Sequence, residues 1–186
     1  MIILASQSPR RQELLKQIVP HFLIEVSHID ESTSLYLPPL LAVKDIAFRK
    51  GQNIAQKHPN DIVISADTIV VLDQQIIGKP RDEEDAKRIL RLLSGKLHTV
   101  ITAFCIFHDG ISMERTVHST VIMNNLEETT IEAYVKTKSP MDKAGAYGVQ
   151  DNTSFHLIKS VNGSVHNVMG FPVEEIKSDL LINHLI

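Results

Sequence analysis

The twelve residues from Leu4 to Leu15, LASQSPRRQELL, decide how the fold of this chain begins. An apolar run over Met1–Ala5 leads into them, and such a run predicts a buried strand. Ser8 and Pro9 then suit the start of a helix, because an N-cap serine can bond free backbone amides and proline fits the first helical position. The stretch therefore predicts a strand that turns directly into a helix.

Two arginines follow the predicted helix start. Arg10 and Arg11 meet an unfavourable field there, since a helix N-terminus carries partial positive charge. A bound phosphate would offset this, because it accepts hydrogen bonds from the backbone amides and from the guanidinium groups. The alternative is that both side chains are solvated, or that one pairs with a surface carboxylate. The residues alone leave both interpretations open.

Strand and helix patterns alternate along the rest of the chain. Further strands are predicted at 21–27, 62–65, 69–72, 75–77, 97–107, 111–123 and 155–161, and further helices at 38–57, 82–93, 129–137 and 172–185. The dipeptide Asp109-Gly110 between the two longest strands predicts a hairpin. Together these elements predict an α/β fold whose sheet is mixed, not purely parallel.

Composition narrows the class of protein. With 186 residues, of which 43% are hydrophobic, the chain is expected to form a single domain over residues 1–186. A net charge of −3 argues against a general nucleic-acid-binding protein, and no apolar run is long enough to predict a membrane span. The single cysteine, Cys105, lies in an apolar run, which favours a core residue in a reducing compartment. Since the N-terminus also lacks a signal-peptide pattern, we expect a cytoplasmic protein.

Two lysines stand at positions where a charged side chain is unusual. Lys50 falls on the apolar stripe of the predicted helix 38–57, so its stem either lies along the edge of the core or carries the ammonium into a cleft. Lys79 lies between a glycine and a proline in a loop, a position suited to reaching a ligand. The two glycine-lysine pairs, Gly78-Lys79 and Gly95-Lys96, do not belong to a P-loop, because the first glycine of that motif is missing both times.

An aspartate is predicted at the carboxyl end of a buried strand, where open α/β sheets bind ligands. This residue, Asp67, could hold a divalent cation, deprotonate a water molecule or cap the following turn. Glu31, in a polar loop, is the acidic partner we expect for Mg²⁺, which favours carboxylate oxygens together with waters and phosphates. The nine histidines lack the H-E-x-x-H spacing of a zinc site. The sequence thus offers basic side chains that could bind a polyphosphate and acidic side chains that could bind a metal ion. Together they indicate an enzyme for phosphoryl or nucleotidyl cleavage.

Several short motifs in a fixed order carry a family resemblance. They are Leu4–Arg11 (LASQSPRR), Ser65–Thr68 (SADT), Gly78–Pro80 (GKP), Leu93–Gly95 (LSG) with His98–Val100 (HTV), Asp142–Gln150 (DKAGAYGVQ) and Gly170–Pro172 (GFP). On these motifs the chain resembles the Maf-type nucleotide pyrophosphatases over nearly its whole length. The resemblance implies an elongated mixed β-sheet flanked by helices, with two lobes around a nucleotide cleft. It also implies a cytoplasmic homodimer that cleaves a nucleoside triphosphate to the monophosphate and pyrophosphate with Mg²⁺ or Mn²⁺.

The resemblance implies roles for individual residues as well. Asp67 matches the proton acceptor of the family, and Glu31 joins it as a metal ligand. Lys50 and Lys79 match catalytic positions around the phosphates. The remaining matches are the substrate-specificity positions Arg10, Thr68 and Gln150 and the phosphate-binding positions Ser6, Ser8 and Arg11.

This sequence departs from the family pattern at Gly51, where alanine is usual. Glycine there is expected to weaken the helix by roughly 1 kcal/mol. Met169 and Phe171, where valine and leucine are common, are expected to reshape the packing beside the site.

The loop Lys143–Gln150 resembles that of the subgroup which prefers dTTP and UTP. The amide of Gln150 both donates and accepts hydrogen bonds, so it could bind the carbonyl and imide edge of a pyrimidine. We therefore expect an enzyme that hydrolyses dTTP, UTP and related or modified pyrimidine nucleotides and so cleans the nucleotide pool. One alternative is a nucleotide-binding regulator of cell division with little turnover. Another keeps the reaction but moves the preference toward purine or modified nucleotides.

Overall fold

The computed structural model describes residues 1–186, except for the side chains of Thr33 and Leu35. The strands are β1 (Ile2–Leu4), β2 (Leu23–Ile24), β3 (Ile62–Leu72), β4 (Gln75–Ile77), β5 (Leu97–His108), β6 (Ile111–Met123) and β7 (Ile158–Asn162). The α-helices are α1 (Pro9–Lys16), α2 (Pro39–Ala55), α3 (Glu83–Leu93), α4 (Glu128–Lys136), α5 (Asn152–Phe155), α6 (Val165–Val168) and α7 (Val173–Ile182). Short 3₁₀ helices are η1 (Ser32–Tyr36), η2 (Ser139–Asp142), η3 (Ala144–Ala146) and η4 (Val149–Asp151).

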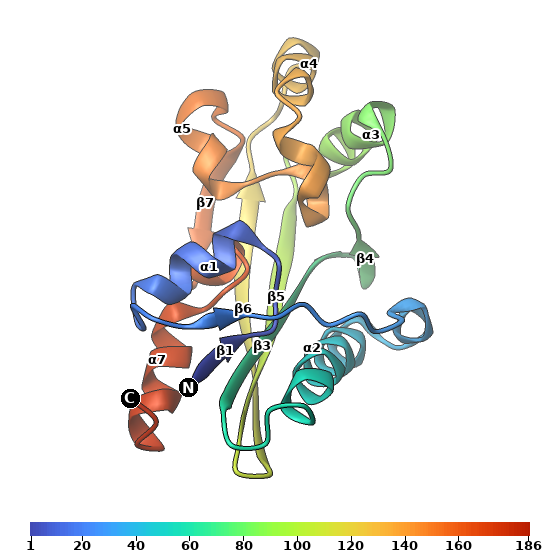
Figure 1. Cartoon of the computed structure of the whole chain (residues 1–186). Helices are drawn as coiled ribbons and strands as arrows, with labels where there is room; N and C mark the ends of the chain where they lie inside the picture. The colour runs from blue at the N-terminus through green and yellow to red at the C-terminus, as the bar shows by residue number, and fades with distance from the viewer. The chain divides into compact units, whose positions relative to one another are not determined.

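The strands form one seven-stranded sheet (Figure 1). Its order is β2-β1-β3-β5-β6-β7, and β4 pairs with β3 off this path. β1 pairs in parallel with β2 and with β3, whereas the β3–β4 and β6–β7 pairs are antiparallel. The predicted α/β class with a mixed sheet is therefore confirmed.

The chain divides into two compact units. The first unit comprises Met1–Thr68, Thr102–Val117 and His166–Ile186, and the second comprises Ile69–Ile101 and His118–Val165. Each of the long strands β3, β5 and β6 contributes residues to both units. A single domain over residues 1–186 stays a prediction.

The core of the first unit joins β1, β3 and β5 to the helices α1 and α7. Buried apolar side chains from these elements form one cluster, which includes Leu4, Leu15, Ile64, Phe104 and Leu180. Phe171, at a position where leucine is common in the family, is completely buried in this cluster, and Met169 packs against it. Both residues flank Gly170, and the expectation that they reshape the packing beside the site stays a prediction.

β3 is one continuous strand instead of the two that the sequence predicted. Its first part pairs in parallel with β1 up to Ile64, and its second part pairs with β4 from Val70 to Leu72. Asp67 and Thr68 lie between these two pairings. The expectation that Asp67 ends a strand is therefore wrong, although the residue does lie past the carboxyl end of the parallel segment.

Two predicted strands are shorter than expected. The segment 21–27 forms only β2, and the segment 155–161 contains β7 preceded by the short helix α5. Asn152 explains the second difference, because its side-chain oxygen accepts a hydrogen bond from the Ile158 amide (2.6 Å) and its side-chain nitrogen donates one to the Ile158 carbonyl (3.2 Å). These local bonds compete with extended pairing and hold residues 152–158 in a turn.

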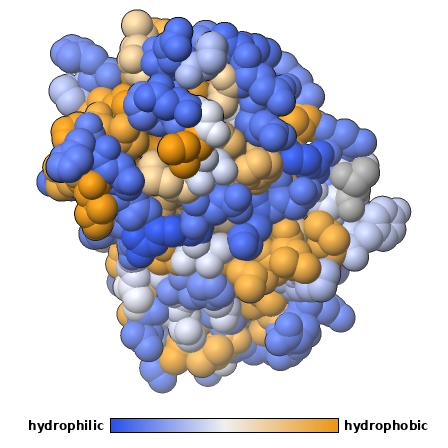
Figure 2. Space-filling model, turned by 90° about the horizontal axis from the view of Figure 1, so that it is seen from below, coloured by the Kyte–Doolittle hydropathy of each residue, from blue (hydrophilic) through white to orange (hydrophobic). Residues whose placement is uncertain are grey.

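The surface is mainly hydrophilic, with separate apolar patches, when the molecule is seen from below (Figure 2). None of the helices in the described part of the chain is both long enough and apolar enough to pass through a membrane.

Gly51 lies inside α2, at a close contact between this helix and β5. A Cβ atom at this position would lie 2.3 Å from Cε2 of Phe107 and 2.5 Å from Oγ of Ser65. Ser65 Oγ in turn donates to the carbonyl of Ala47, one turn earlier in the same helix (2.8 Å). Glycine at this position therefore lets the Phe107 ring lie directly against the helix backbone.

We expect Gly51→Ala to destabilise the protein. The forced displacement of Phe107 and Ser65 costs about 1–3 kcal/mol, which exceeds the gain of about 1 kcal/mol in helix propensity. Urea unfolding followed by circular dichroism measures the difference. Gly78→Ala is the matched control, because a Cβ atom there meets nothing within 4 Å. A Gly51→Ala protein as stable as the Gly78→Ala protein would show that the contact relaxes without cost.

Candidate active site

The turn from β1 into α1 leaves the amides at the start of the helix free of side-chain caps. Ser8 occupies the N-cap position and Pro9 the first helical position, but the Ser8 side chain makes no capping hydrogen bond. The predicted capping role of Ser8 is therefore wrong. Instead, the backbone amide of Ser8 donates to Oγ of the buried Ser6 (3.2 Å). With no acidic residue in the first turn, this helix end matches the requirements of an anion site.

Arg11 is fixed by three hydrogen bonds inside the first unit. Its Nε donates to the Gly170 carbonyl (2.9 Å), Nη2 to Oγ1 of Thr68 (3.2 Å) and Nη1 to Oγ of Ser6 (3.4 Å). Burial lowers the pKa of this guanidinium from its ordinary value, while the nearby Asp67 carboxylate raises it. A guanidinium has five N–H donors, so two remain for a ligand once these three bonds are made. The half-buried Arg10 lies beside it on the first turn of α1.

Thr68 is held by a small network of hydroxyl and carbonyl groups. Its Oγ1 lies 2.9 Å from Oγ1 of Thr102, which donates to the Asn167 carbonyl (3.1 Å). The same Thr68 hydroxyl also lies 3.4 Å from the Gly170 carbonyl that Arg11 contacts. This network ties the middle of β3 to β5 and to the segment after α6, and it fixes Thr68 beside the Arg11 guanidinium.

Lys50 places its ammonium between two carboxylates. Its Nζ lies 2.9 Å from Oδ1 of Asp67 and 2.8 Å from Oε1 of Glu31. The side chains of Lys50 and Asp67 are largely buried, at 17% and 15% exposure, whereas Glu31 is half exposed. Of the two positions considered for Lys50, the structure therefore shows the ammonium paired with acids and not solvated along the core edge.

The acidic pair determines what kind of metal ion could bind. Among the residues that the structure describes, no group of three or more histidine, cysteine or acidic side chains could hold a metal ion without help. Asp67 and Glu31 nevertheless approach the same ammonium, so their carboxylates face one small volume. Such a pair fits Mg²⁺ or Mn²⁺, which is commonly bound by one or two carboxylates, waters and substrate phosphates. The donor set therefore suits a metal that arrives with a polyphosphate.

The second unit holds the other predicted site residues. Lys79 is exposed in the loop after β4, and Gly78 before it accepts a hydrogen bond from the Gly145 amide (3.0 Å). Gln150 is exposed in η4. The loop that carries Lys79 is thereby tied to the segment that leads to Gln150.

Tyr134 holds the turn on both sides of Gln150. Its hydroxyl donates to Oδ2 of Asp151 (2.6 Å) and accepts from the Gly148 amide (3.1 Å). A Cβ atom at Gly148 would lie 2.7 Å from Nε2 of Gln150 and 2.8 Å from Cε of Lys143, so only glycine lets the Gln150 amide pack this closely. These two bonds of Tyr134, called the Tyr134 clamp, therefore fix the backbone turn that carries Gln150, the residue that the family resemblance assigns to base selection.

Before Gln150 in the same loop, the side chain of Tyr147 contacts a histidine. The Tyr147 hydroxyl lies 2.6 Å from Nε2 of His98, and both residues are buried. Burial lowers the pKa of His98 to about 4, so its ring is neutral at pH 7. This buried contact holds Tyr147 against β5.

Comparison with known proteins identifies the family. The profile of the family described as "Maf-like protein" matches residues 1–181. The chain belongs to the Maf-like protein family. Two curated relatives carry the name dTTP/UTP pyrophosphatase. The protein of Thermococcus onnurineus is 41% identical and the alignment covers 94% of this chain and 93% of the relative, while that of Bacillus mycoides is 42% identical over 96% and 93%.

Solved structures support the fold of this Maf-like protein. A HAM1 protein from Coxiella burnetii aligns with a TM-score of 0.60 at 13% sequence identity, over 97% of this chain and 98% of the other. The Ham1 protein of Staphylococcus aureus aligns with a TM-score of 0.57 at 11% identity, over 98% of each chain. At such low identity these similarities show the fold alone.

The site of this Maf-like protein is thus built mainly in the first unit. Asp67, Lys50 and Glu31 meet one another, and Arg11 meets Ser6 and Thr68. Two predicted residues, Lys79 and Gln150, belong to the second unit. Sequence reasoning assigned no role to Thr102, Asn167 or Tyr134, although they position the predicted residues. The glycine-phenylalanine-proline motif at 170–172 marked the segment after Asn167. Nothing in the pattern indicated that the Gly170 carbonyl accepts a hydrogen bond from Arg11.

Proposed function

We propose that this Maf-like protein hydrolyses dTTP, UTP and related pyrimidine nucleoside triphosphates to the monophosphate and pyrophosphate. The Asp67–Lys50–Glu31 cluster carries the proposal, because two carboxylates that meet at one ammonium support Asp67 as the proton acceptor and Asp67 and Glu31 as ligands of a metal ion. The names of the relatives supply the substrate class. Clearing unwanted or modified pyrimidine nucleotides from the cellular pool is the role that this activity would serve.

The charged side chains of the candidate site support cleavage of a triphosphate. Arg10, Arg11 and Lys50 of the first unit neutralise the triphosphate, and the two spare N–H groups of Arg11 bind its oxygens; the family resemblance adds Lys79 to this role. Asp67 and Glu31 would hold a divalent ion, which would supply further charge neutralisation at the phosphates. Lys50 holds the Asp67 carboxylate in place through its 2.9 Å contact.

The reaction step itself needs a nucleophile and a proton acceptor. A water molecule attacks the α-phosphorus, and the bond between that phosphorus and the oxygen bridging to the β-phosphate breaks. Asp67 accepts the proton that the water loses. The products are the nucleoside monophosphate and pyrophosphate, which leaves with the bridging oxygen.

Cell location and assembly are part of the same proposal. A cytoplasmic location is supported by the buried, unpaired Cys105, whose thiol pKa burial raises to about 12, so that it stays protonated and inert. The homodimer rests on the family resemblance, and sedimentation of the purified protein tests it.

Incubation of the full chain with dTTP and Mg²⁺, followed by separation of the products, tests the proposed function. We expect dTMP and pyrophosphate in equal amounts. Release of orthophosphate with dTDP would place the cleavage at the wrong bond. Tight binding of dTTP without pyrophosphate release would favour the alternative of a nucleotide-binding regulator.

Gln150→Ala is expected to reduce discrimination between pyrimidine and purine triphosphates. The exposed Gln150 amide, held between the two residues that Tyr134 contacts, is available to the base edge. Loss of hydrogen bonds to that edge should lower kcat/KM for dTTP and UTP about tenfold relative to purine triphosphates. Gln75→Ala, at an exposed position on β4, is the control and should keep the wild-type preference. An unchanged ranking of substrates in Gln150→Ala would remove this residue from base selection.

A further inference from the structure

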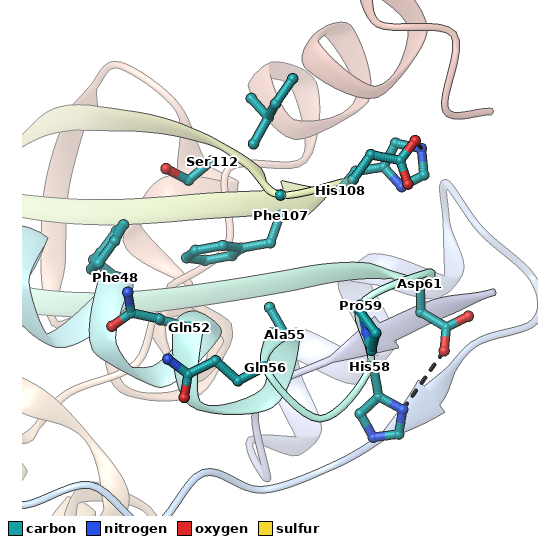
Figure 3. Close-up of a pocket in the computed structure, with 13 residues that line it drawn as sticks. Phe48, Gln52, Ala55, Gln56, His58, Pro59, Asp61, Phe107, His108 and Ser112 are labelled. Carbon is teal, nitrogen blue, oxygen red and sulfur yellow. Dashed lines mark ion pairs between the residues drawn. The ribbon is translucent and has the colours of Figure 1, made fainter.

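A cavity of about 320 Å³ lies in the first unit, between the second half of α2 and the turn that joins β5 to β6 (Figure 3). This volume falls within the range of sites that bind small organic molecules. Its lining includes none of the residues assigned to the candidate active site. The cavity is therefore a separate feature that the proposed reaction does not use.

Two phenylalanine rings form the apolar wall of the cavity. The rings of Phe48 and Phe107 lie with their centroids 5.4 Å apart and their planes tilted by 50°. Phe48, Gln52 and Ala55 are spaced so that they share one face of α2, and this face meets Phe107 across the cavity (Figure 3). Because the rings already touch each other, a planar ligand would lie against them and not between them.

Polar groups surround this wall. The amides of Gln52 and Gln56 and the hydroxyl of Ser112 line the opening, and all three side chains belong to exposed residues. His108 also lines the cavity, and its Nδ1 is buried with no hydrogen-bond partner among the described residues. Its Nε2 lies 3.2 Å from Oδ2 of Asp109, so a neutral ring carries its proton on Nε2 and leaves Nδ1 as an acceptor. A ligand with donors and acceptors along its edge would satisfy these groups.

The charges around the cavity exclude a phosphorylated ligand. Asp61 and Asp109 both line it, and no lysine or arginine is among its thirteen lining residues. Asp61 already pairs with the N-terminal ammonium (2.8 Å), while His58 lies 3.6 Å from its other carboxylate oxygen. Asp109 likewise lies against His108, so a phosphate would meet two carboxylates and no lysine or arginine among the lining residues, in contrast to the cationic candidate active site.

We propose that this cavity is a binding site for a small planar heteroaromatic molecule that is neutral or cationic, such as a free nucleobase. The ring system stacks on Phe48 and Phe107, and its edge exchanges hydrogen bonds with Gln52, Gln56 and Ser112. The proposal does not depend on the pyrophosphatase activity.

Titration of the full chain, labelled with ¹⁵N, with adenine tests the site by two-dimensional NMR. Adenine is planar, uncharged at neutral pH and carries donors and acceptors along its edge. We expect saturable shifts that concentrate at the amides of residues 52–56 and 108–112, with millimolar or tighter affinity. Adenosine monophosphate should shift the same amides at least about ten times more weakly, because its phosphate meets the aspartates.

Two variants locate the binding. Ala55→Phe fills the cavity and should weaken adenine binding at least about tenfold, whereas the same change at Ala133, exposed on α4 in the second unit, should leave the affinity unchanged. Gln52→Leu keeps the volume of an exposed side chain, removes its amide and should weaken binding several-fold, which provides a second test if Ala55→Phe folds poorly. The proposal is overturned if adenine shifts none of these amides up to its solubility limit. Equal binding of adenine and its monophosphate, or wild-type affinity in folded Ala55→Phe or in Gln52→Leu, would overturn it as well.

Discussion

Asp67→Asn is expected to lower kcat for dTTP by about 10²–10⁴, the usual contribution of a positioned proton acceptor. Asparagine keeps the shape of the side chain, and its carbonyl oxygen can still accept the bond from Lys50 that the structure shows at 2.9 Å. It cannot take a proton from water, so the loss reports chemistry and not packing. Pyrophosphate release under saturating dTTP and Mg²⁺ measures the effect.

A matched carboxylate-to-amide change separates this effect from a change in net charge. Glu114→Gln alters an exposed residue of β6 in the same unit and should keep wild-type turnover. Activity of Asp67→Asn that returns to normal at high Mg²⁺ would assign the residue to metal binding alone. Near-normal turnover at ordinary Mg²⁺ would remove Asp67 from both roles.

Arg11→Lys is expected to impair both catalysis and stability. Lysine supplies a point charge but cannot reach the Gly170 carbonyl, Thr68 and Ser6 at once, as the planar guanidinium does. We expect unfolding free energy to fall by about 1–3 kcal/mol, since buried acceptors lose a charged donor. The displaced Thr68 and the lost donors to phosphate should also lower kcat/KM about a hundredfold.

Thermal unfolding and steady-state kinetics check this prediction together. Arg88→Lys is the control, because the Arg88 side chain is 61% exposed and pairs with Asp85 of its own helix. Lysine keeps the charge of this exposed side chain and Asp85 still accepts hydrogen bonds from Arg81, so the control should unfold close to the wild-type temperature. If Arg11→Lys unfolds at the control temperature and turns over dTTP normally, the three bonds have neither a structural nor a catalytic role.

Elements that depend on residues close together in the chain could be predicted from the sequence. The step from β1 into α1 follows from an apolar run and a proline within nine residues, and the β5–β6 turn follows from Asp109-Gly110. The helix α3 begins where Asp82 accepts a bond from the Asp85 amide (2.8 Å), as an N-cap aspartate should. In each case the residues that cause the structure are neighbours in the chain.

Contacts between distant segments could not be predicted in this way. Arg11 and Gly170 are 159 residues apart, and no spacing rule connects an arginine to a backbone carbonyl at such a distance. The pairing of Lys50 with both acids likewise depends on how α2 packs on β3, which Ser65 helps to set through its bond to Ala47. The sequence did not predict the full length of β3, because its middle residues, Ala66 to Thr68, carry no strand pattern. In the structure, the network around Thr68 holds this part of the strand.

Family resemblance supplied the remaining information about the site. From the residues alone, the two arginines of the opening stretch had an equally good explanation as solvated side chains. The structure shows that Arg11 is tied to three groups in the first unit, so at least one of the pair has a fixed position. The role of Gln150 rests on the resemblance and on the Tyr134 clamp that orients its turn.

Hydrolysis of dTTP in water enriched with ¹⁸O tests whether water attacks the α-phosphorus. The proposed attack at the α-phosphorus, with Asp67 as the proton acceptor, places the labelled oxygen in dTMP and leaves pyrophosphate unlabelled. Isotope-shifted ³¹P NMR or mass spectrometry of the separated products distinguishes the two. Label in dTMP after a single turnover is the result we predict, and label in pyrophosphate would show attack at the β-phosphorus and contradict the mechanism.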